Sequence, residues 1–315
     1  MKNKIIRIGT RGSELARYQA DQVRLEIEKN FPGIEVEIVV IITQGDKNLE
    51  VSLSKMGDKG VFTKELEIAM LNNETDMAVH SLKDLPTSFP PGLKLGAVLK
   101  RAEVRDALVS KNGKTLSQLG PGDVIATSSL RRKSQLLAYN PDFNIIDIRG
   151  NVTTRLAKMD KGYCDAQIMA ATALQRLGLD ERITQIIDPD IMFPAVSQGA
   201  IGIEVREGDP LIDEIMTGIN HEETMLITKA ERAFLRSMEG GCQIPIGGYS
   251  IINGNDYHFT GFIADLNGKK SIKVSLSGRL EEAETITLAV SKQMMVAGAT
   301  EILAEIRNAA GYIAD

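Results

Sequence analysis

The residues with the clearest chemical potential surround Cys242, in the segment GGCQIPIG at positions 240–247. Paired glycines permit unusual backbone angles and Pro245 removes a backbone donor, so this segment is not the interior of a helix or a central strand. We expect a tight loop on which a reactant could reach the thiol. A small buried apolar residue in a turn is the commoner role of a free cysteine, and the local sequence alone favours that role.

Five further segments carry hydroxyl and basic side chains at predicted junctions between strands and helices. Hydroxyls, helix N-terminal amides and guanidinium groups suit carboxylates or phosphates. Helix capping and a solvated arginine explain any one segment, but five in equivalent positions favour an anion site. The residues are Arg11 and Ser13; Lys55 and Lys59; His80, Ser81 and Lys83; Thr127, Ser128, Ser129, Arg131 and Arg132; and Arg149, Gly150 and Arg155.

Asp84 stands among these cations, in the segment HSLKDLP at 80–86. Its carboxylate could simply form an ion pair with Lys83 or a nearby arginine. Its functional interpretation is a group that holds a proton or faces a developing positive charge. The second cysteine, Cys164, precedes an apolar run at 166–170, and we predict a core position for it.

Composition excludes several classes of protein. The 315 residues have a net charge of −5, no tryptophan and 4% aromatic residues, so we expect no nucleic-acid partner. Two cysteines give no disulfide framework, which fits a reducing cytoplasm. The three histidines lie far apart and predict no zinc site. We find neither the apolar stretch of a signal peptide nor a membrane span.

The first two thirds of the chain alternate strand-like and helix-like segments. Strands are predicted at 5–10, at 35–43 and ending near His80, and at 107–110, 124–127, 144–148 and 165–170. Helices are predicted from Ser13 to about Lys29, from about Thr63, from Ser128 or Ser129, from Asn151 and up to Leu177. Such βαβ alternation predicts parallel or mixed sheets covered by helices, with ligands bound where strands end.

The segment from Gln44 to Gly60 is polar and weakly periodic. We predict a long loop that is mobile at rest and covers the site during catalysis, because long loops in compact domains are usually functional or mobile. After about Glu222 the pattern changes to a helix reaching Met238, strands at 246–252, 258–264 and 271–276, and one final helix over 281–310. This predicts a small α+β domain.

Seven ordered segments resemble the porphobilinogen deaminase family, also called hydroxymethylbilane synthases, of tetrapyrrole, porphyrin and heme biosynthesis. The resemblance covers essentially the whole chain, and the combination of HSLKDLP, TSSLRR and GGCQIPIG is specific. The segments are IGTRGSELARYQ (8–19), GDKGVFTKELE (57–67), AVHSLKDLP (78–86), TSSLRRKSQL (127–136), RGNVTTRL (149–156), PAVSQGAIGIEVR (194–206) and GGCQIPIG (240–247). Two mild departures are Asp58, beside Lys59, and Ser197, where a smaller residue is usual.

The resemblance implies a transferase that deaminates four porphobilinogen molecules and joins them head to tail into hydroxymethylbilane. It implies a dipyrromethane cofactor in thioether linkage to Cys242, which is built from porphobilinogen and remains as a primer. It implies no metal, nicotinamide or pyridoxal. The expected protein is a cytoplasmic monomer whose only partner is its small-molecule substrate.

The resemblance also implies a fold and a set of site residues. The fold is α/β, with two lobes resembling type II periplasmic binding proteins and a small C-terminal α+β domain. Lobe 1 is expected at 1–99 with 200–217, lobe 2 at 100–199 and the C-terminal domain at 218–315, whose Cys242 loop reaches between the lobes. Asp84 is expected to be catalytic, and Gln198 joins the basic and hydroxyl residues above in binding cofactor or substrate.

A different class of protein would fit the basic turns equally well. This alternative is a non-catalytic, two-lobed binding protein for a small carboxylate. It explains neither the Cys242 loop nor the missing export signal. An intact mass above the sequence value by one dipyrromethane would favour the enzyme.

Overall fold

Residues 5–47, 60–238 and 244–309 are described here by a computed structural model, so Lys55, Lys59 and Cys242 lie outside the described residues. The described chain divides into two compact units. The first unit holds the residues up to 47 together with 60–102 and 199–226. The second unit holds 103–198, 227–238 and 244–309.

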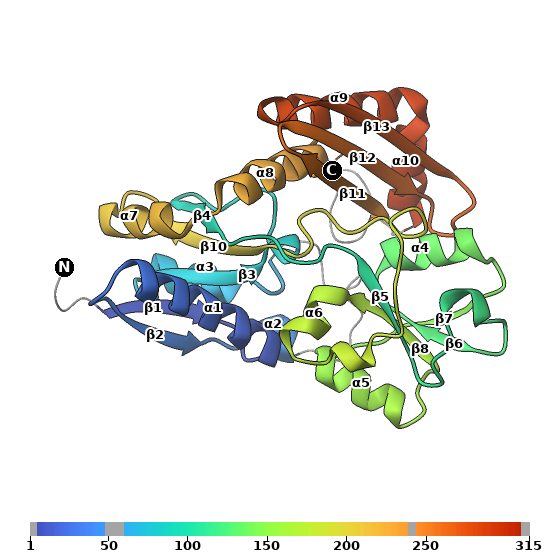
Figure 1. Cartoon of the computed structure of the whole chain (residues 1–315), viewed down its shortest axis with the longest axis horizontal. Helices are drawn as coiled ribbons and strands as arrows, with labels where there is room; N and C mark the ends of the chain where they lie inside the picture. Colours follow the sequence, from blue (N-terminus) through green and yellow to red (C-terminus); the bar gives the residue numbers. More distant parts are fainter. Residues whose placement is uncertain (1–4, 48–59, 239–243, 310–315) are drawn as a thin grey trace. The chain divides into compact units, whose positions relative to one another are not determined.

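The first unit is built on a five-stranded sheet of order β2-β1-β3-β10-β4 (Figure 1). β1 is parallel to β2 and β3, whereas β10 is antiparallel to both β3 and β4. The strands are β1 (Ile5–Thr10), β2 (Glu35–Val40), β3 (Met77–Ser81), β4 (Leu93–Val98) and β10 (Ile201–Arg206). The helices are α1 (Glu14–Asn30), α2 (Gln44–Lys47), α3 (Lys64–Leu71) and α7 (Pro210–Ile219).

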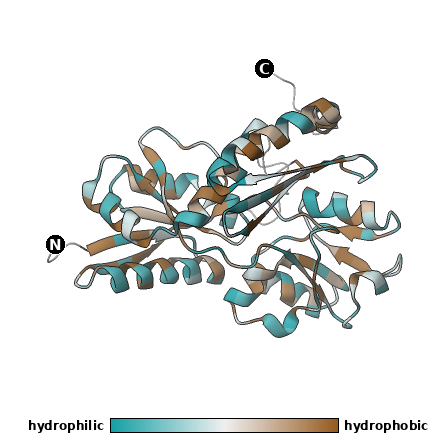
Figure 2. Cartoon of the chain, turned by 45° about the horizontal axis from the view of Figure 1, so that its top comes forward, coloured by the Kyte–Doolittle hydropathy of each residue, from teal (hydrophilic) through white to brown (hydrophobic). Residues whose placement is uncertain are grey.

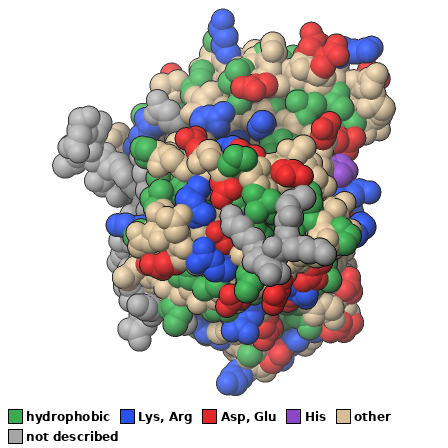
Figure 3. All heavy atoms as spheres, turned by 90° about the vertical axis from the view of Figure 1, so that its left-hand side faces the viewer, with side chains coloured by type: hydrophobic (Ala, Val, Ile, Leu, Met, Phe, Trp, Pro, Cys, Tyr) green, Lys and Arg blue, Asp and Glu red, His purple; other side chains and the backbone are tan. Residues whose placement is uncertain are grey.

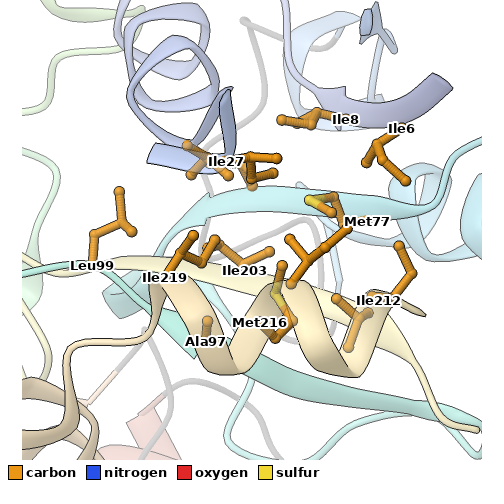
Figure 4. Close-up of a cluster of buried hydrophobic side chains, with 14 of the residues drawn as sticks. Ile6, Ile8, Ile27, Met77, Ala97, Leu99, Ile203, Ile212, Met216 and Ile219 are labelled. Atoms are coloured by element: carbon orange, nitrogen blue, oxygen red, sulfur yellow. The ribbon is translucent and has the colours of Figure 1, made fainter. Parts of the chain in front are cut away.

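Alternating side chains of β3 divide the core of this unit between two faces of the sheet. Met77 and Val79 belong to the cluster that α1 and α7 cover, in which Ile27 and Met216 pack over the strands (Figure 4). Ala78 belongs to the cluster beneath α3. The strands are mostly hydrophobic and α1 is mixed, as expected for a sheet buried by amphipathic helices (Figure 2).

The second unit repeats this arrangement in a sheet of order β7-β6-β8-β5-β9. β6 is parallel to β7 and β8, and β5 is antiparallel to β8 and β9. The strands are β5 (Asp106–Ser110), β6 (Val124–Ala126), β7 (Asn144–Ile146), β8 (Ala166–Ala170) and β9 (Gln185–Ile186). The helices are α4 (Leu130–Tyr139), α5 (Val152–Asp160) and α6 (Ala171–Arg176).

A three-stranded antiparallel sheet, β11-β12-β13, completes the second unit, and α9 packs on β12 and β13 (Figure 1). Its core holds Phe234 of α8 edge-on to Phe259 of β12, with ring centroids 5.0 Å apart. The elements are α8 (Glu222–Ser237), β11 (Ile246–Asn253), β12 (Asp256–Ala264), β13 (Ser271–Arg279), α9 (Ala283–Met294) and α10 (Thr300–Ala309). Short 3₁₀ turns occupy Leu82–Asp84, Leu116–Gln118, Asp180–Arg182 and Leu280–Glu282.

The predicted fold class is confirmed: an α/β chain with two sheet-bearing lobes and a small C-terminal α+β domain. Two local predictions were wrong. Gln44–Lys47 forms a short helix instead of the start of a loop, with Asp46 bonded to Thr43 at its first turn. The final helix is interrupted over Met295–Ala299, because Gly298 adopts a left-handed φ of 104°.

On the face drawn in Figure 3, acidic and basic side chains intermingle and no large patch of one charge sign is seen. This agrees with the modest net charge of −5. Within the described ranges, no helix combines the length and apolarity needed to cross a membrane.

Ser197 is the strained residue of the segment that leads from the second unit back to the first. Its φ is 62°, a left-handed value that favours glycine, and its buried Oγ has no hydrogen-bond partner in the described chain. Its backbone N–H donates to Glu231 Oε2 at 2.7 Å, which fixes this conformation. A smaller residue therefore suits this position, as the sequence comparison above suggested.

We predict that Ser197→Gly raises the free energy of unfolding by about 1 kcal/mol, because left-handed strain and an unpaired hydroxyl are both removed. Urea unfolding measures the change. The control is Asn73→Gly, at a φ of 59°, where asparagine already tolerates the conformation and little change is expected. A Ser197→Gly variant no more stable than its parent would contradict the strain.

Candidate functional site

In the first unit, Arg11 lies in the turn after β1, where its guanidinium contacts the Asp46 carboxylate and the Phe62 ring. Its Nη2 donates to Asp46 Oδ1 at 2.5 Å and its Nε to Oδ2 at 3.3 Å. Its guanidinium carbon lies 4.0 Å from the centre of the Phe62 ring. Burial raises the pKa of Asp46, but the hydrogen bond and charge of Arg11 outweigh it and lower the pKa overall.

The turn after β3 lies at the same sheet edge as the turn after β1, because these strands are parallel neighbours. Ser13 caps α1, where its Oγ accepts from the Ala16 N–H at 3.3 Å. Ser81 is bonded at 2.9 Å to Gln19 of that helix, which ties the two turns together. The first unit thus brings Arg11, Ser13 and Ser81 to one edge.

His80 is buried just before this turn and does not face solvent. Its Nε2 lies 3.1 Å from Glu204 Oε2 of β10, and the Glu204 side chain is fully buried. The second Glu204 oxygen has no partner among the described residues. The pair therefore fixes β3 against β10, and the structure gives His80 a supporting position behind the turn.

Asp84 ends the 3₁₀ turn that follows β3 and is exposed. Within the described ranges its carboxylate forms no ion pair or hydrogen bond, including with the neighbouring Lys83. The turn itself is held by the Leu82 N–H, which donates to Ala200 O at 3.0 Å. A carboxylate on a fixed turn with no internal partner is available to a ligand or a proton.

In the second unit, the turn after β6 is built from three hydroxyl residues. Thr127 is buried, and its Oγ1 accepts from the Ser129 N–H at 3.3 Å. Ser128 bridges to the segment just after β7 by donating to Ile148 O at 2.8 Å and accepting from its N–H at 3.0 Å. Ser129 caps α4. These bonds lock the turn that precedes Arg131 and Arg132.

Both arginines of this turn are nearly buried, with side chains 6% and 8% exposed, and both bind Asp106 at the start of β5. Arg131 Nη2 donates to Oδ2 at 2.7 Å, and Arg132 donates to Oδ1 at 2.7 Å and 3.2 Å. Gln198, also buried, donates to the same Oδ1 at 3.0 Å. Burial lowers the pKa of Arg131, while the charge of Asp106 opposes that shift.

The turn after β7 contains Arg149, Gly150 and, one helical turn on, Arg155. Gly150 has a φ of 118°, and a Cβ there would lie 2.7 Å from a Thr154 methyl, so only glycine fits. Arg155 Nε donates to Gly150 O at 2.7 Å, and Lys158 Nζ donates to Arg149 O at 3.0 Å. Burial lowers the pKa of Arg149. The side chains of Arg155 and Lys158 thus stabilise this turn by binding its backbone carbonyls.

Four residues that hold the predicted ones were not recognised in the sequence: Gln19, Asp46, Asp106 and Glu204. Asp106 had a detectable signal, since an acid directly ahead of the buried run 107–110 needs a cation. Gln19 and Asp46 carried none, because their partners are distant in sequence. Among the described residues, no group of three or more His, Cys, Asp or Glu side chains could hold a metal ion.

Comparison with known proteins identifies the family. Residues 6–214 match the family "Porphobilinogen deaminase, dipyromethane cofactor binding domain", and residues 225–296 match "Porphobilinogen deaminase, C-terminal domain". The porphobilinogen deaminase of Chloroherpeton thalassium is 47% identical over 98% of this chain and 99% of its own length. That of Geobacter sulfurreducens is 46% identical over 96% of this chain and 94% of its own. The chain therefore belongs to the porphobilinogen deaminase family.

Solved structures also match this chain at low identity. The BenM effector-binding domain matches with a TM-score of 0.42 at 17% identity, over 70% of this chain and 93% of that domain. The periplasmic VFT2 domain of Bordetella pertussis BvgS matches with a TM-score of 0.40 at 14% identity, over 73% of this chain and 90% of that domain.

We predict that Asp46→Asn lowers the free energy of unfolding by about 1 kcal/mol at pH 7, because Arg11 loses its counter-charge. The pKa of Asp46 is lowered in the folded chain, so its stabilisation is present above the unfolded value, about 3.9, and is lost as pH falls through the folded value. The difference between variant and parent should therefore shrink in acid.

Urea unfolding at several pH values measures this difference. The control is Asp142→Asn, at an exposed side chain, which should change stability by less than about 0.5 kcal/mol. A difference between Asp46→Asn and its parent that stays constant down to pH 3 would exclude the proposed ion pair.

Proposed function

We propose that this chain is a hydroxymethylbilane synthase. It removes ammonia from four porphobilinogen molecules and joins them head to tail into a linear tetrapyrrole. The observation that carries this proposal is the match to porphobilinogen deaminases at 44–48% identity over nearly the whole length of both chains. The specific segments around Asp84, Arg131 and Cys242 lie within that match.

We propose that a dipyrromethane group is attached to Cys242 through a thioether and primes the chain of rings. When bound, it supplies the free pyrrole carbon to which the first substrate ring is joined. Cys242 is favoured because the other cysteine is unsuitable. Cys164 is 3% exposed, and burial together with the charge of Asp165 raises the pKa of its thiol to about 11.

The donor set of the described residues fits a group rich in carboxylates. Each pyrrole ring carries an acetate and a propionate, so a growing chain needs several fixed cations and hydrogen-bond donors. We propose that Arg131, Arg132 and Arg155 bind the carboxylates of the cofactor. The remaining candidates are assigned to cofactor, substrate or growing product: Arg11, Ser13, Lys55, Lys59, Ser81, Lys83, Thr127, Ser128, Ser129, Arg149 and Gly150. His80, buried against Glu204, and Gln198, buried against Asp106, support the site from behind instead of binding the ligand.

Asp84 is the proposed catalytic residue. Loss of ammonia from porphobilinogen leaves an electron-poor azafulvene, whose positive charge is shared with the pyrrole nitrogen. A carboxylate that accepts a hydrogen bond from that N–H stabilises the charge. In its protonated form the Asp84 carboxyl can give a proton to the departing amine, and the carboxylate that remains can take the ring proton that is released after coupling.

Several further features belong to this proposal. We propose that the protein is a monomer in a reducing cytoplasm, with porphobilinogen as its substrate. The division into lobe 1 (1–99 with 200–217), lobe 2 (100–199) and a C-terminal domain (218–315) is part of it. The segment 44–60, of which 48–59 lie outside the described residues, is proposed to cover the growing product. A non-catalytic carboxylate-binding protein is the alternative, and no specific observation favours it.

The proposal predicts a covalent adduct on Cys242. The purified parent chain should have an intact mass above its sequence value by one dipyrromethane and give a colour with Ehrlich's reagent. Cys242→Ser should lack both, and peptide mapping should leave Cys164 unmodified. A chain at its sequence mass, or an adduct on the Cys164 peptide, would refute the assignment.

The proposal also predicts that Asp84→Asn folds with parental stability but turns over porphobilinogen roughly 10²–10⁴ times more slowly, the usual worth of a positioned acid or base. Asp84→Glu keeps the charge and should retain some activity. The matched control is Asp142→Asn, at another exposed aspartate. Parental turnover by Asp84→Asn would show that the carboxylate has no catalytic role.

A further inference from the structure

The two arginines in the first turn of α4 depend on one buried carboxylate. Asp106 starts β5 opposite Ala170, the last residue of the antiparallel strand β8, so it lies at the sheet edge where β8 ends. The first turn of α4 lies at this edge because β6, which precedes it, runs parallel to β8. Asp106 is 0% exposed and reaches both guanidinium groups of that turn.

Without a counter-charge, two arginines would be unfavourable in the first turn of α4. Their like charges repel, and the first turn of a helix carries positive potential that disfavours cations. α4 has no acid in its own first turn to offset this. Asp106 supplies the missing negative charge and leaves the cluster of three side chains with a net charge of +1, which suits a bound carboxylate.

The contacts of Asp106 orient the two guanidinium groups as well as balancing their charge. Its Oδ2 accepts from Arg131, while its Oδ1 accepts from Arg132 and Gln198. Each guanidinium is fixed from a second direction by a backbone carbonyl, Arg131 by Phe193 O and Arg132 by Ile168 O at 3.0 Å. Of five N–H donors each, the described residues engage two of Arg131 and three of Arg132, so donors remain for a ligand.

We propose that Asp106 is a positioning residue for cofactor binding: it orients Arg131 and Arg132 so that their remaining N–H groups meet the cofactor carboxylates. This inference rests on the proposed function, in which those two arginines bind the cofactor. Asp106 itself touches neither cofactor nor substrate in this role. Its effect should appear in how completely the chain acquires its adduct.

The first unit offers a matched control in Asp76. This buried carboxylate also serves two arginines, with Arg7 Nη2 at 3.1 Å and Arg206 Nη2 at 3.3 Å from Oδ1. Arg7 also donates to Oδ2 through its Nε, at 3.2 Å, and its backbone N–H, at 2.9 Å. None of these three residues belongs to the proposed site. Substitution of Asp76 should therefore disturb a similar cluster without disturbing cofactor binding.

The decisive variant is Asp106→Glu, which keeps the charge but moves the carboxylate by about 1.5 Å, one carbon–carbon bond. Intact mass measures the fraction of purified chain that carries the adduct, and thermal unfolding measures stability. We expect that fraction to fall at least about tenfold in Asp106→Glu and in Asp106→Asn, since misplacement of this size is costly in a binding constellation. Asp76→Glu and Asp76→Asn should lose stability but keep the parental fraction.

Three results would overturn the inference. The first is parental adduct content in Asp106→Glu, which would show that Asp106 acts only by compensating charge and not by orienting the arginines. The second is an equal loss of adduct in Asp76 variants of equal stability, which would make the effect one of folding. The third is parental adduct content in Gln198→Met, which decides the matter if neither Asp106 variant folds. If neither Asp106 variant folds, the positioning role predicts that Gln198→Met loses part of its adduct, although the charges of Asp106, Arg131 and Arg132 are all kept.

Arg131→Leu and Arg132→Leu separate this inference from the function on which it rests. If either arginine variant loses the adduct while Asp106→Glu retains it, only the positioning role fails. If both arginine variants acquire the adduct as the parent does, the assignment of the arginines fails, and the inference fails with it. A parent chain without any adduct would refute the proposed function itself.

Discussion

Two guanidinium groups on consecutive residues can share a nearly dry environment only when a carboxylate lies between them, and Asp106 meets that requirement for Arg131 and Arg132. Much of the second unit is organised around this contact. Arg131 also binds the carbonyl of Phe193, whose ring stacks on Phe262 of β12 with centroids 5.2 Å apart. The contact therefore joins β5, α4 and the C-terminal sheet into one packed body.

The close approach of the C-terminal sheet to α4 adds to this coupling. A Cβ at Gly268, in the turn between β12 and β13, would lie 2.2 Å from the Ser134 carbonyl of α4, so glycine is needed there. Lys273 of β13 lies over the Phe193 ring at 4.9 Å and pairs with Asp190 at 3.2 Å. The sheet that begins just after Cys242 in sequence is thus braced against α4, whose first turn carries Arg131 and Arg132. In the proposed function, that bracing holds the arginines in register with the domain that carries the cofactor.

Local signals predicted the parts of this structure that local chemistry determines. Ser13, Ser129 and Asn151 were expected at helix starts and cap α1, α4 and α5. The strands β4 and β10 were not anticipated, because they pair across more than a hundred residues. The helix α7 was also missed, although Asp209 caps it and Pro210 stands in its first turn. The burial of Arg131 and Arg132 was also not anticipated. Arginine usually signals a surface, and only the tertiary position of Asp106 makes burial favourable. Asp84 was identified from its neighbours and lies on an exposed turn, and its catalytic role stays a prediction.

In the proposed function, rings are added one at a time to a primer that stays on the protein. Intact mass spectrometry of the purified chain, sampled after mixing with limiting porphobilinogen, tests it most directly. We expect a starting species above the sequence mass, then discrete species that each gain one porphobilinogen less one ammonia. The mass should return to its starting value when the tetrapyrrole is released. A single species at the sequence mass throughout, with porphobilinogen bound only reversibly, would contradict the account.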